Sequence, residues 1–164
     1  DHDFGFRTRA LGFKILSVPA ARCLHGAGTE DLSIRRLGAY AERRVFYLVR
    51  NRWLFVLGNY SWRTLVLLFP VLLFYELAQL VISIKKGWSR PWFRALGSVL
   101  SRLPAVVSTR RRFRRLRRVP DRELLIGGPV PLRADLTSSP WDRRAKELLD
   151  TLVVTYWRFI RSWL

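Results

Sequence analysis

The chain has 164 residues, enough for one domain or for part of a larger protein. Its 30 Lys and Arg residues against 12 Asp and Glu residues give a net charge of +18, which favours an anionic partner, either a membrane surface or a nucleic acid. The single cysteine, Cys23, excludes an internal disulfide, and one Cys with two His excludes a structural zinc site of four Cys and His ligands from this chain alone. Because the sequence has no Met and begins within a helical pattern, we expect a C-terminal fragment of a longer protein.

The first eleven residues predict a short helix. Apolar and basic residues from Phe4 to Leu11 recur at helical spacing, and Gly12 lies where a helix C-cap is expected. Asp1 and Asp3 would then lie at the helix N-terminus, where the helix dipole favours carboxylates.

Two short strands and a long helix are predicted next. Residues 13–18 are rich in β-forming side chains and stop at Pro19, and residues 22–25 form a second extended candidate that leads into a Gly-rich connection. From Leu37 the pattern becomes helical. A polar region of mixed structure therefore precedes a long helical region.

The order of these motifs resembles a known enzyme family. The segments DHDFGFR (1–7), LGFKILSVPAARCLHGAG (11–28) and YLVRNRWLFVLGNY (47–60) are similar to the second half of the catalytic domain of family-2 inverting glycosyltransferases, particularly the bacterial rhamnosyltransferase-like branch. In that family a Glu-Asp-x-Asp segment opens a helix, then come a strand, a Pro and a His-Gly pair, and then a Tyr-x-x-Arg-Asn helix. This chain lacks the Glu because it starts at the first Asp.

The resemblance implies a fold. Residues 1–60 would be the C-terminal end of a GT-A α/β nucleotide-sugar transferase domain, with one short helix and two short strands, and its nucleotide-binding half would lie upstream. Membrane-associated hydrophobic and amphipathic helices would follow, so the fragment would be mainly α.

The resemblance also implies the roles of five polar residues. Asp1 would be the catalytic base that removes the proton of the acceptor hydroxyl while its oxygen attacks the anomeric carbon from the face opposite the nucleotide. His25 would complete the coordination of a divalent ion, Mg²⁺ or Mn²⁺, whose other ligands lie mostly in the missing N-terminal half. Asp3, Arg50 and Asn51 would bind the acceptor or the donor diphosphate.

Each of these residues also has a structural interpretation. Asp1 and Asp3 suit helix-capping carboxylates, His25 suits a hydrogen-bonded residue at a strand end, and Arg50 with Asn51 suits a solvated helix face. The idea that Asp1 and Asp3 form the metal-binding Asp-x-Asp motif is less favoured, because in the family that motif ends a strand well upstream.

Residues 64–84 form an apolar segment of 21 residues, just long enough to span a bilayer. Glu76 and Gln79 interrupt it, and a charged Glu76 at the bilayer centre would cost about 2.5 kcal/mol or more unless it were protonated or paired. Both flanks are basic, so charge favours neither orientation. We therefore prefer an interfacial or re-entrant segment bent at Pro70; a true span and a buried core helix remain the alternatives.

The region after this segment combines aromatic and cationic residues. An amphipathic helix is predicted from Pro91, and eight arginines lie between residues 110 and 122. Each such cation contributes about 1 kcal/mol to binding an anionic lipid surface. We expect membrane contacts from Trp88, Trp92, Arg110, Arg111, Arg112, Arg114 and Arg115. A solvated helix and an RNA-binding segment are the alternatives, with nucleic acid the less favoured partner.

The sequence therefore predicts four regions. They are the end of a catalytic domain (1–60), a hydrophobic and polybasic membrane-associated helical region (61–122), a linker (123–140) and an amphipathic helix (141–164). The predicted function is transfer of a sugar, with inversion, from a nucleotide-sugar donor such as dTDP-rhamnose to a lipid-linked or cell-envelope glycan acceptor. The predicted location is the cytoplasmic face of the bacterial inner membrane, and this fragment alone should be inactive. The alternative is a non-enzymatic basic adaptor that binds membrane or nucleic acid.

Overall fold

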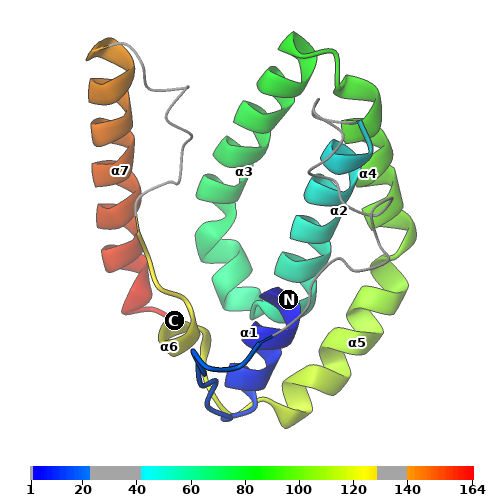
Figure 1. Ribbon diagram of the computed structural model, residues 1–164, viewed down its shortest axis with the longest axis vertical. Coiled ribbons are helices and arrows are strands. Elements are labelled where there is room, and N and C mark those ends of the chain that lie inside the picture. Colours follow the sequence, from blue (N-terminus) through cyan, green and yellow to red (C-terminus); the bar gives the residue numbers. More distant parts are fainter. Residues whose placement is uncertain (1, 23–41, 129–139) are drawn as a thin grey trace.

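The computed structural model describes residues 2–22, 42–128 and 140–164, and within these residues the chain is helical and contains no β-strand. The helices are α1 (His2–Ala10), α2 (Glu42–Asn59), α3 (Trp62–Lys85), α4 (Ser89–Ser101), α5 (Leu103–Leu116), α6 (Asp121–Leu124) and α7 (Pro140–Arg161). Helices α2 and α4 lie side by side, α1 and α6 lie together at one end, and α7 lies on the far side of α3 from α4 (Figure 1).

Two small clusters of buried side chains hold the helices together. Val45 and Val49 of α2 pack against Trp92 and Ala95 of α4. At the other end of the molecule, a second cluster joins α1, α5 and α6 through Ala10, Phe113 and Leu124. The apolar faces of α2 and α4 are therefore used to cover each other.

The end of α1 agrees with the sequence prediction. Gly12 has a φ of 91°, a backbone conformation that side chains with a Cβ rarely adopt. The N–H of Gly12 donates to the carbonyl of Arg9 (2.9 Å), and the N–H of Phe13 donates to the carbonyl of Thr8 (3.1 Å). These two bonds form a Schellman motif, which satisfies carbonyls that the last helical turn leaves free.

The predicted α/β end of a GT-A domain is wrong for the described residues, whereas the mainly α prediction is confirmed. Residues 13–18 are neither helical nor paired in a sheet, and their side chains are exposed. A β-forming sequence becomes a strand only when a neighbouring strand accepts its hydrogen bonds, and the described residues provide none. The second predicted strand, residues 22–25, lies outside the described residues apart from Arg22.

Helix α3 extends the predicted apolar segment by two residues at its start and one at its end. The Ser61 hydroxyl accepts a hydrogen bond from the Thr64 N–H (3.1 Å) and so caps the helix. Pro70 lies inside α3 without ending it. Gly87, at a φ of 72°, follows the last residues of the helix and allows the chain to turn into α4.

Candidate functional site

Helix α3 is the one helix among the described residues that is long and apolar enough to cross a membrane. None of the side chains in its most apolar stretch of 18 residues is buried in the fold. Its exposed large apolar residues are Trp62, Val66, Phe69, Leu73, Phe74, Tyr75, Leu77, Val81, Ile82 and Ile84. An apolar surface of this extent on one helix is typical of a segment that contacts lipid or another protein.

The acidic residue in the middle of α3 is paired. The carboxylate of Glu76, whose side chain is 12% exposed, forms an ion pair with the guanidinium of Arg52 on α2. The indole N–H of Trp53 donates to the same carboxylate oxygen at 2.8 Å. The pairing that would lower the cost of Glu76 in an apolar environment is therefore present, and it ties the middle of α3 to α2.

The arginines expected at the membrane have two different environments. Arg111, Arg112, Arg114 and Arg115 are exposed on α5. Arg110 is only 4% exposed, because its guanidinium donates to the carbonyl of Leu57 and lies 4.2 Å from the ring centre of Trp62. Burial lowers the pKa of Arg110, and nearby Arg114 lowers it further. Arg110 is therefore a packing residue rather than a surface cation.

The expected tryptophan anchors are also placed differently from the prediction. Trp92 is 5% exposed and lies in the cluster between α2 and α4, and Trp88 packs against the same cluster. The reason is that the apolar face of α4 meets Val45 and Val49 rather than solvent. Sequence reasoning missed Trp62, which is 57% exposed at the start of α3; its position beside the apolar segment was the available signal.

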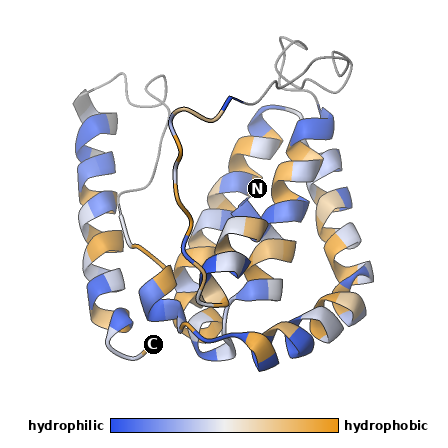
Figure 2. Cartoon of the chain, turned by 60° about the horizontal axis from the view of Figure 1, so that its bottom comes forward, coloured by the Kyte–Doolittle hydropathy of each residue, from blue (hydrophilic) through white to orange (hydrophobic). Residues whose placement is uncertain are grey.

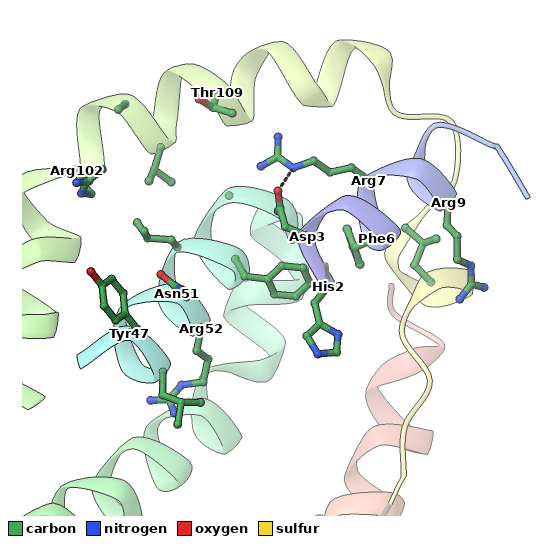
Figure 3. A pocket seen from close by; sticks show the side chains of 18 of the residues that line it. His2, Asp3, Phe6, Arg7, Arg9, Tyr47, Asn51, Arg52, Arg102 and Thr109 are labelled. Carbon is green, nitrogen blue, oxygen red and sulfur yellow. Dashed lines mark ion pairs between the residues drawn. The ribbon is translucent and has the colours of Figure 1, made fainter. Parts of the chain in front are cut away.

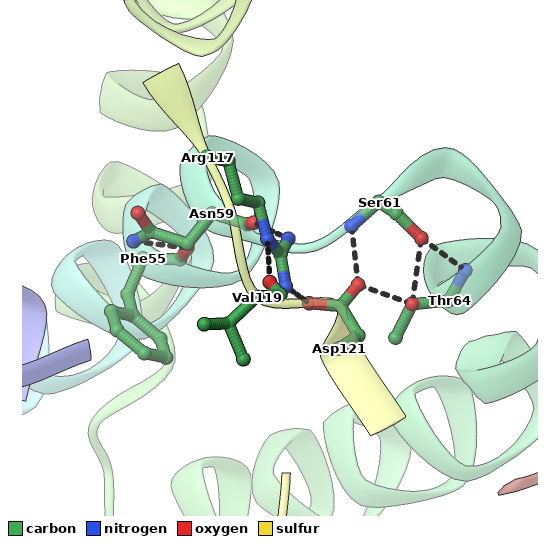
Figure 4. Close-up of polar contacts among 7 residues, drawn as sticks. All are labelled: Phe55, Asn59, Ser61, Thr64, Arg117, Val119 and Asp121. Atoms are coloured by element: carbon green, nitrogen blue, oxygen red, sulfur yellow. Dashed lines mark hydrogen bonds and ion pairs between the residues drawn. The ribbon is translucent and has the colours of Figure 1, made fainter. Parts of the chain in front are cut away.

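A buried polar network joins the start of α3 to α6 (Figure 4). The carboxylate of Asp121 accepts hydrogen bonds from the Ser61 N–H (2.7 Å) and the Thr64 hydroxyl, and it forms an ion pair with Arg117. Arg117 also donates to the carbonyls of Asn59 (3.2 Å) and Val119 (2.7 Å). Sequence reasoning treated Arg117 as part of a basic surface and missed this network.

A pocket of about 1270 Å³ lies among α1, α2 and α5 (Figure 3). Its lining brings together Asp3 and Asn51, two of the residues expected to bind acceptor or diphosphate. The arginines in the lining are Arg7, Arg9, Arg44, Arg52 and Arg102. Asp3 forms an ion pair with Arg7 (2.9 Å) and accepts a hydrogen bond from the Asn59 amide (2.6 Å), so it also fastens α1 to α2.

The third residue of the expected set, Arg50, is not among the residues that line the pocket. Its guanidinium donates from Nε and Nη2 to the side-chain oxygen of Asn51, at 3.0 and 2.9 Å, and lies 4.7 Å from the ring centre of Tyr47. Arg50 therefore orients Asn51 from outside the pocket.

Comparisons with family models, with curated proteins and with solved structures found no match. The glycosyltransferase prediction consequently rests on the motifs within residues 1–60. Asp1 and His25, the expected base and metal ligand, lie outside the described residues. Within the described ranges there is no group of three or more His, Cys, Asp or Glu residues that could hold a metal ion.

Proposed function

We propose that this chain is the membrane-binding part of an inverting glycosyltransferase that acts at the cytoplasmic face of the bacterial inner membrane. The observation that carries the membrane part is the 24-residue helix α3, which leaves apolar side chains exposed along its whole length. The enzymatic part rests on the resemblance of residues 1–60, with Asp1 as the base and a nucleotide sugar as the donor.

The link between Glu76 and Arg52 supports an interfacial or re-entrant α3 rather than a span. If α3 crossed the bilayer, Glu76 would lie within the hydrocarbon and would bring Arg52 of α2 with it. The neighbours of Arg52 on α2 include Arg50 and the exposed Asn51, which are costly to remove from water. An α3 that lies in the interface leaves these groups hydrated.

Both flanks of α3 are basic, which gives a span no preferred orientation but suits an interfacial helix with both ends on the cytoplasmic side. Lys85, Lys86 and Arg90 lie at or just after the end of α3, and basic segments next to membrane-embedded helices are enriched on the cytoplasmic side. Anionic lipid headgroups on that leaflet attract them further.

The arginine-lined pocket supports an anionic, lipid-linked acceptor. Arg9 and Arg102 are exposed in its lining, and the Asn51 amide adds a neutral polar group. Guanidinium groups bind phosphate oxygens in a bidentate manner. In the reaction, Asp1 would deprotonate the acceptor hydroxyl, and a divalent ion held mostly by residues outside this chain would neutralise the departing diphosphate.

Vesicle flotation of the 164-residue chain tests the membrane part. We expect the chain to stay attached at 1 M salt, where screening acts over about 3 Å, because burial of α3 is not screened. Leu73→Asp with Phe74→Asp should be released by high salt. The control, Phe93→Asp with Leu100→Asp, makes the same change at exposed apolar residues of α4 and should stay attached. Release of the unmodified chain at 1 M salt would contradict membrane insertion.

The enzymatic part requires the longer protein that the resemblance implies. Asp1→Asn should abolish sugar transfer and leave the affinity for the nucleotide sugar nearly unchanged, because a base acts on the transition state. An equal loss of donor affinity would instead give Asp1 a metal-binding or structural role. The control, Asp3→Asn, should retain measurable transfer.

A basic membrane adaptor without catalysis is the second candidate. It is favoured by the fact that α3 and the exposed arginines of α5 suffice for binding an anionic bilayer. Absence of sugar transfer by the longer wild-type protein, together with intact vesicle binding, would favour the adaptor.

A further inference from the structure

Helix α7 has an exposed apolar stripe along one side. Trp141, Leu148, Leu152 and Phe159 are separated by seven, four and seven residues, a spacing that places all four on one face of a helix. Their side chains are between 59% and 77% exposed. Trp163, just beyond the end of α7, is also exposed. In Figure 2, hydrophilic and hydrophobic residues alternate along α7, as in an amphipathic helix.

A different face of α7 attaches it to the rest of the molecule. Ile160 is 1% exposed, and the Tyr156 hydroxyl donates to the carbonyl of Leu67 on α3. Trp157 lies directly against the backbone of Gly127, since a Cβ on that glycine would be 1.8 Å from the Trp157 ring. Because these contacts hold the last turns of α7, the exposed stripe is not needed to attach the helix to the rest of the molecule.

The stripe is chemically matched to the boundary between lipid tails and headgroups. Tryptophan lies at both of its ends, and tryptophan is enriched at that boundary. Arg143, Arg158 and Arg161 are exposed on other faces of the same segment, and the exposed Arg144 places its guanidinium 5.8 Å from the ring centre of Trp141. Amphipathic helices with aromatic and aliphatic residues on one face and arginines on the other bind in the plane of anionic bilayers.

The stripe is also continuous with α3. Trp163 and the first turns of α3 line a shared groove of about 380 Å³, whose other residues are Trp62, Arg63, Val66 and Leu67. Trp62 and Val66 belong to the exposed apolar surface of α3. A bilayer that covers that end of α3 therefore meets Trp163 as well.

We propose that α7 is a second lipid-binding helix, which lies in the interface of an anionic bilayer with its Trp141, Leu148, Leu152 and Phe159 side chains in the acyl region. This inference rests on the proposed membrane function of α3. It adds a separate contact: α3 and α7 bind the same bilayer from two segments about 80 residues apart in the sequence.

Site-directed fluorescence on the full chain tests this proposal. In a Cys23→Ser background, an environment-sensitive dye is attached at Leu152→Cys on the stripe, at Thr151→Cys on the adjacent polar face, or at Leu73→Cys on α3. With vesicles that contain anionic lipid, we expect several-fold brighter, blue-shifted emission from the dyes at 152 and 73, quenched by nitroxide-labelled acyl chains. The dye at 151 should change little.

The outcomes separate the two proposals. A response at 73 but not at 152 overturns the inference about α7 and leaves the membrane function of α3 standing. Silence at both positions overturns both. A response at 152 that grows with protein concentration in the absence of vesicles means that a second copy of the chain covers the stripe, which also overturns the inference.

A charge substitution provides an independent measurement. Leu152→Asp should lower the vesicle partition coefficient by about tenfold, because a leucine side chain is replaced by a charge in the apolar layer. Thr151→Asp adds the same charge one residue away and should change partitioning by about twofold or less. Equal effects of the two substitutions would mean that net charge alone controls binding, and the inference would fail.

Discussion

The carboxylate of Asp121 is 3% exposed and receives donors from a distant part of the chain and from a residue four positions earlier. Ser61 and Thr64 come from the start of α3, and Arg117 comes from the end of α5. A buried carboxylate is stable only when donors of this kind replace water. Asp121 therefore serves as the fixed point to which both helices are attached.

Asp121→Asn should lower the free energy of unfolding by about 3 to 5 kcal/mol, because it leaves the Arg117 cation buried without its counter-ion. Urea unfolding followed by circular dichroism measures the change. The control is Glu123→Gln, an exposed carboxylate in the same short helix, which should shift stability by about 0.5 kcal/mol or less. Similar losses for both variants would contradict the role given to Asp121.

Tyr60 predicts how stability changes at alkaline pH. Burial, followed by the nearby Asp121 carboxylate, raises the pKa of Tyr60 to about 12 from its usual value near 10. The folded protein thus holds the Tyr60 proton more tightly than the unfolded chain does. The resulting contribution to the free energy of unfolding is complete below about pH 10 and is lost between about pH 10 and 12.

Tyr60→Phe removes this titration and keeps the ring that packs against Phe6 and Phe55. Between pH 9 and pH 12 the wild type should lose about 2 kcal/mol more stability than the variant. Unfolding curves of the two proteins, measured in parallel, cancel the titration of other tyrosines and lysines. Parallel pH profiles would show that Tyr60 ionises as easily in the folded state as in the unfolded state.

At the scale of elements, sequence periodicity predicted helices such as α1 and α3 well, but it predicted poorly which side chains the fold buries and which segments pair as strands. The pattern of Phe4 to Leu11 and the apolar run 64–84 gave α1 and α3, because helix hydrogen bonds are local. Residues 13–18 failed as a strand because a strand depends on a partner elsewhere in the chain. The burial of Trp92 and Arg110 was equally unpredictable, since it depends on which helices meet.

In the candidate site, too, the features that depend on local sequence were predicted, and those that depend on distant contacts were missed. The sequence motifs identified Asp3 and Asn51, and the fold brings both to one pocket. The sequence analysis named pairing of Glu76 only as a condition for placing it in a bilayer. It could not identify Arg52 as the partner, because nothing in the local sequence relates residues 24 positions apart on different helices. The contacts of Asp121 with Ser61 and Thr64, which join residues 57 to 60 positions apart, left no recognisable pattern in the sequence.

The attachment of α7 depends on Gly127. A Cβ at this position would lie 1.8 Å from Cδ1 of Trp157, so Gly127→Ala should displace the indole and loosen α7, at a cost of about 1 to 3 kcal/mol. Gly128→Ala is the matched control, because a Cβ there has no neighbour within 4 Å. Hydrogen exchange of α7 amides should accelerate in the first variant only. Unchanged protection in both would mean that Trp157 does not anchor the helix.

At the scale of the whole molecule, which carries a net charge of +18, we expect the exposed arginines of α5 to control the choice of lipid rather than attachment itself. Changing the exposed Arg111, Arg112, Arg114 and Arg115 to Gln should abolish the preference for anionic over neutral vesicles, while the chain remains bound to both. Flotation with vesicles of each composition measures this.

The control for this variant removes four exposed cations elsewhere: Lys14, Arg22, Arg43 and Arg90. Both variants lose four charges, so they differ only in where the charge is lost. If both variants lose the preference for anionic vesicles equally, the total charge of the protein determines that preference, and α5 has no special role.

The Asp121 network also sets an order of events during synthesis. Thr64 precedes Asp121 by 57 residues, which at about 5 to 20 residues per second corresponds to roughly 3 to 11 seconds of translation. By the end of this interval the entire apolar helix has left the catalytic centre of the ribosome, and until then the carboxylate that fastens its first turn does not exist. Arg52 and Trp53 of α2 are made before α3 and can already bind Glu76, but the first turn of the nascent helix is fastened only once Asp121 has been made.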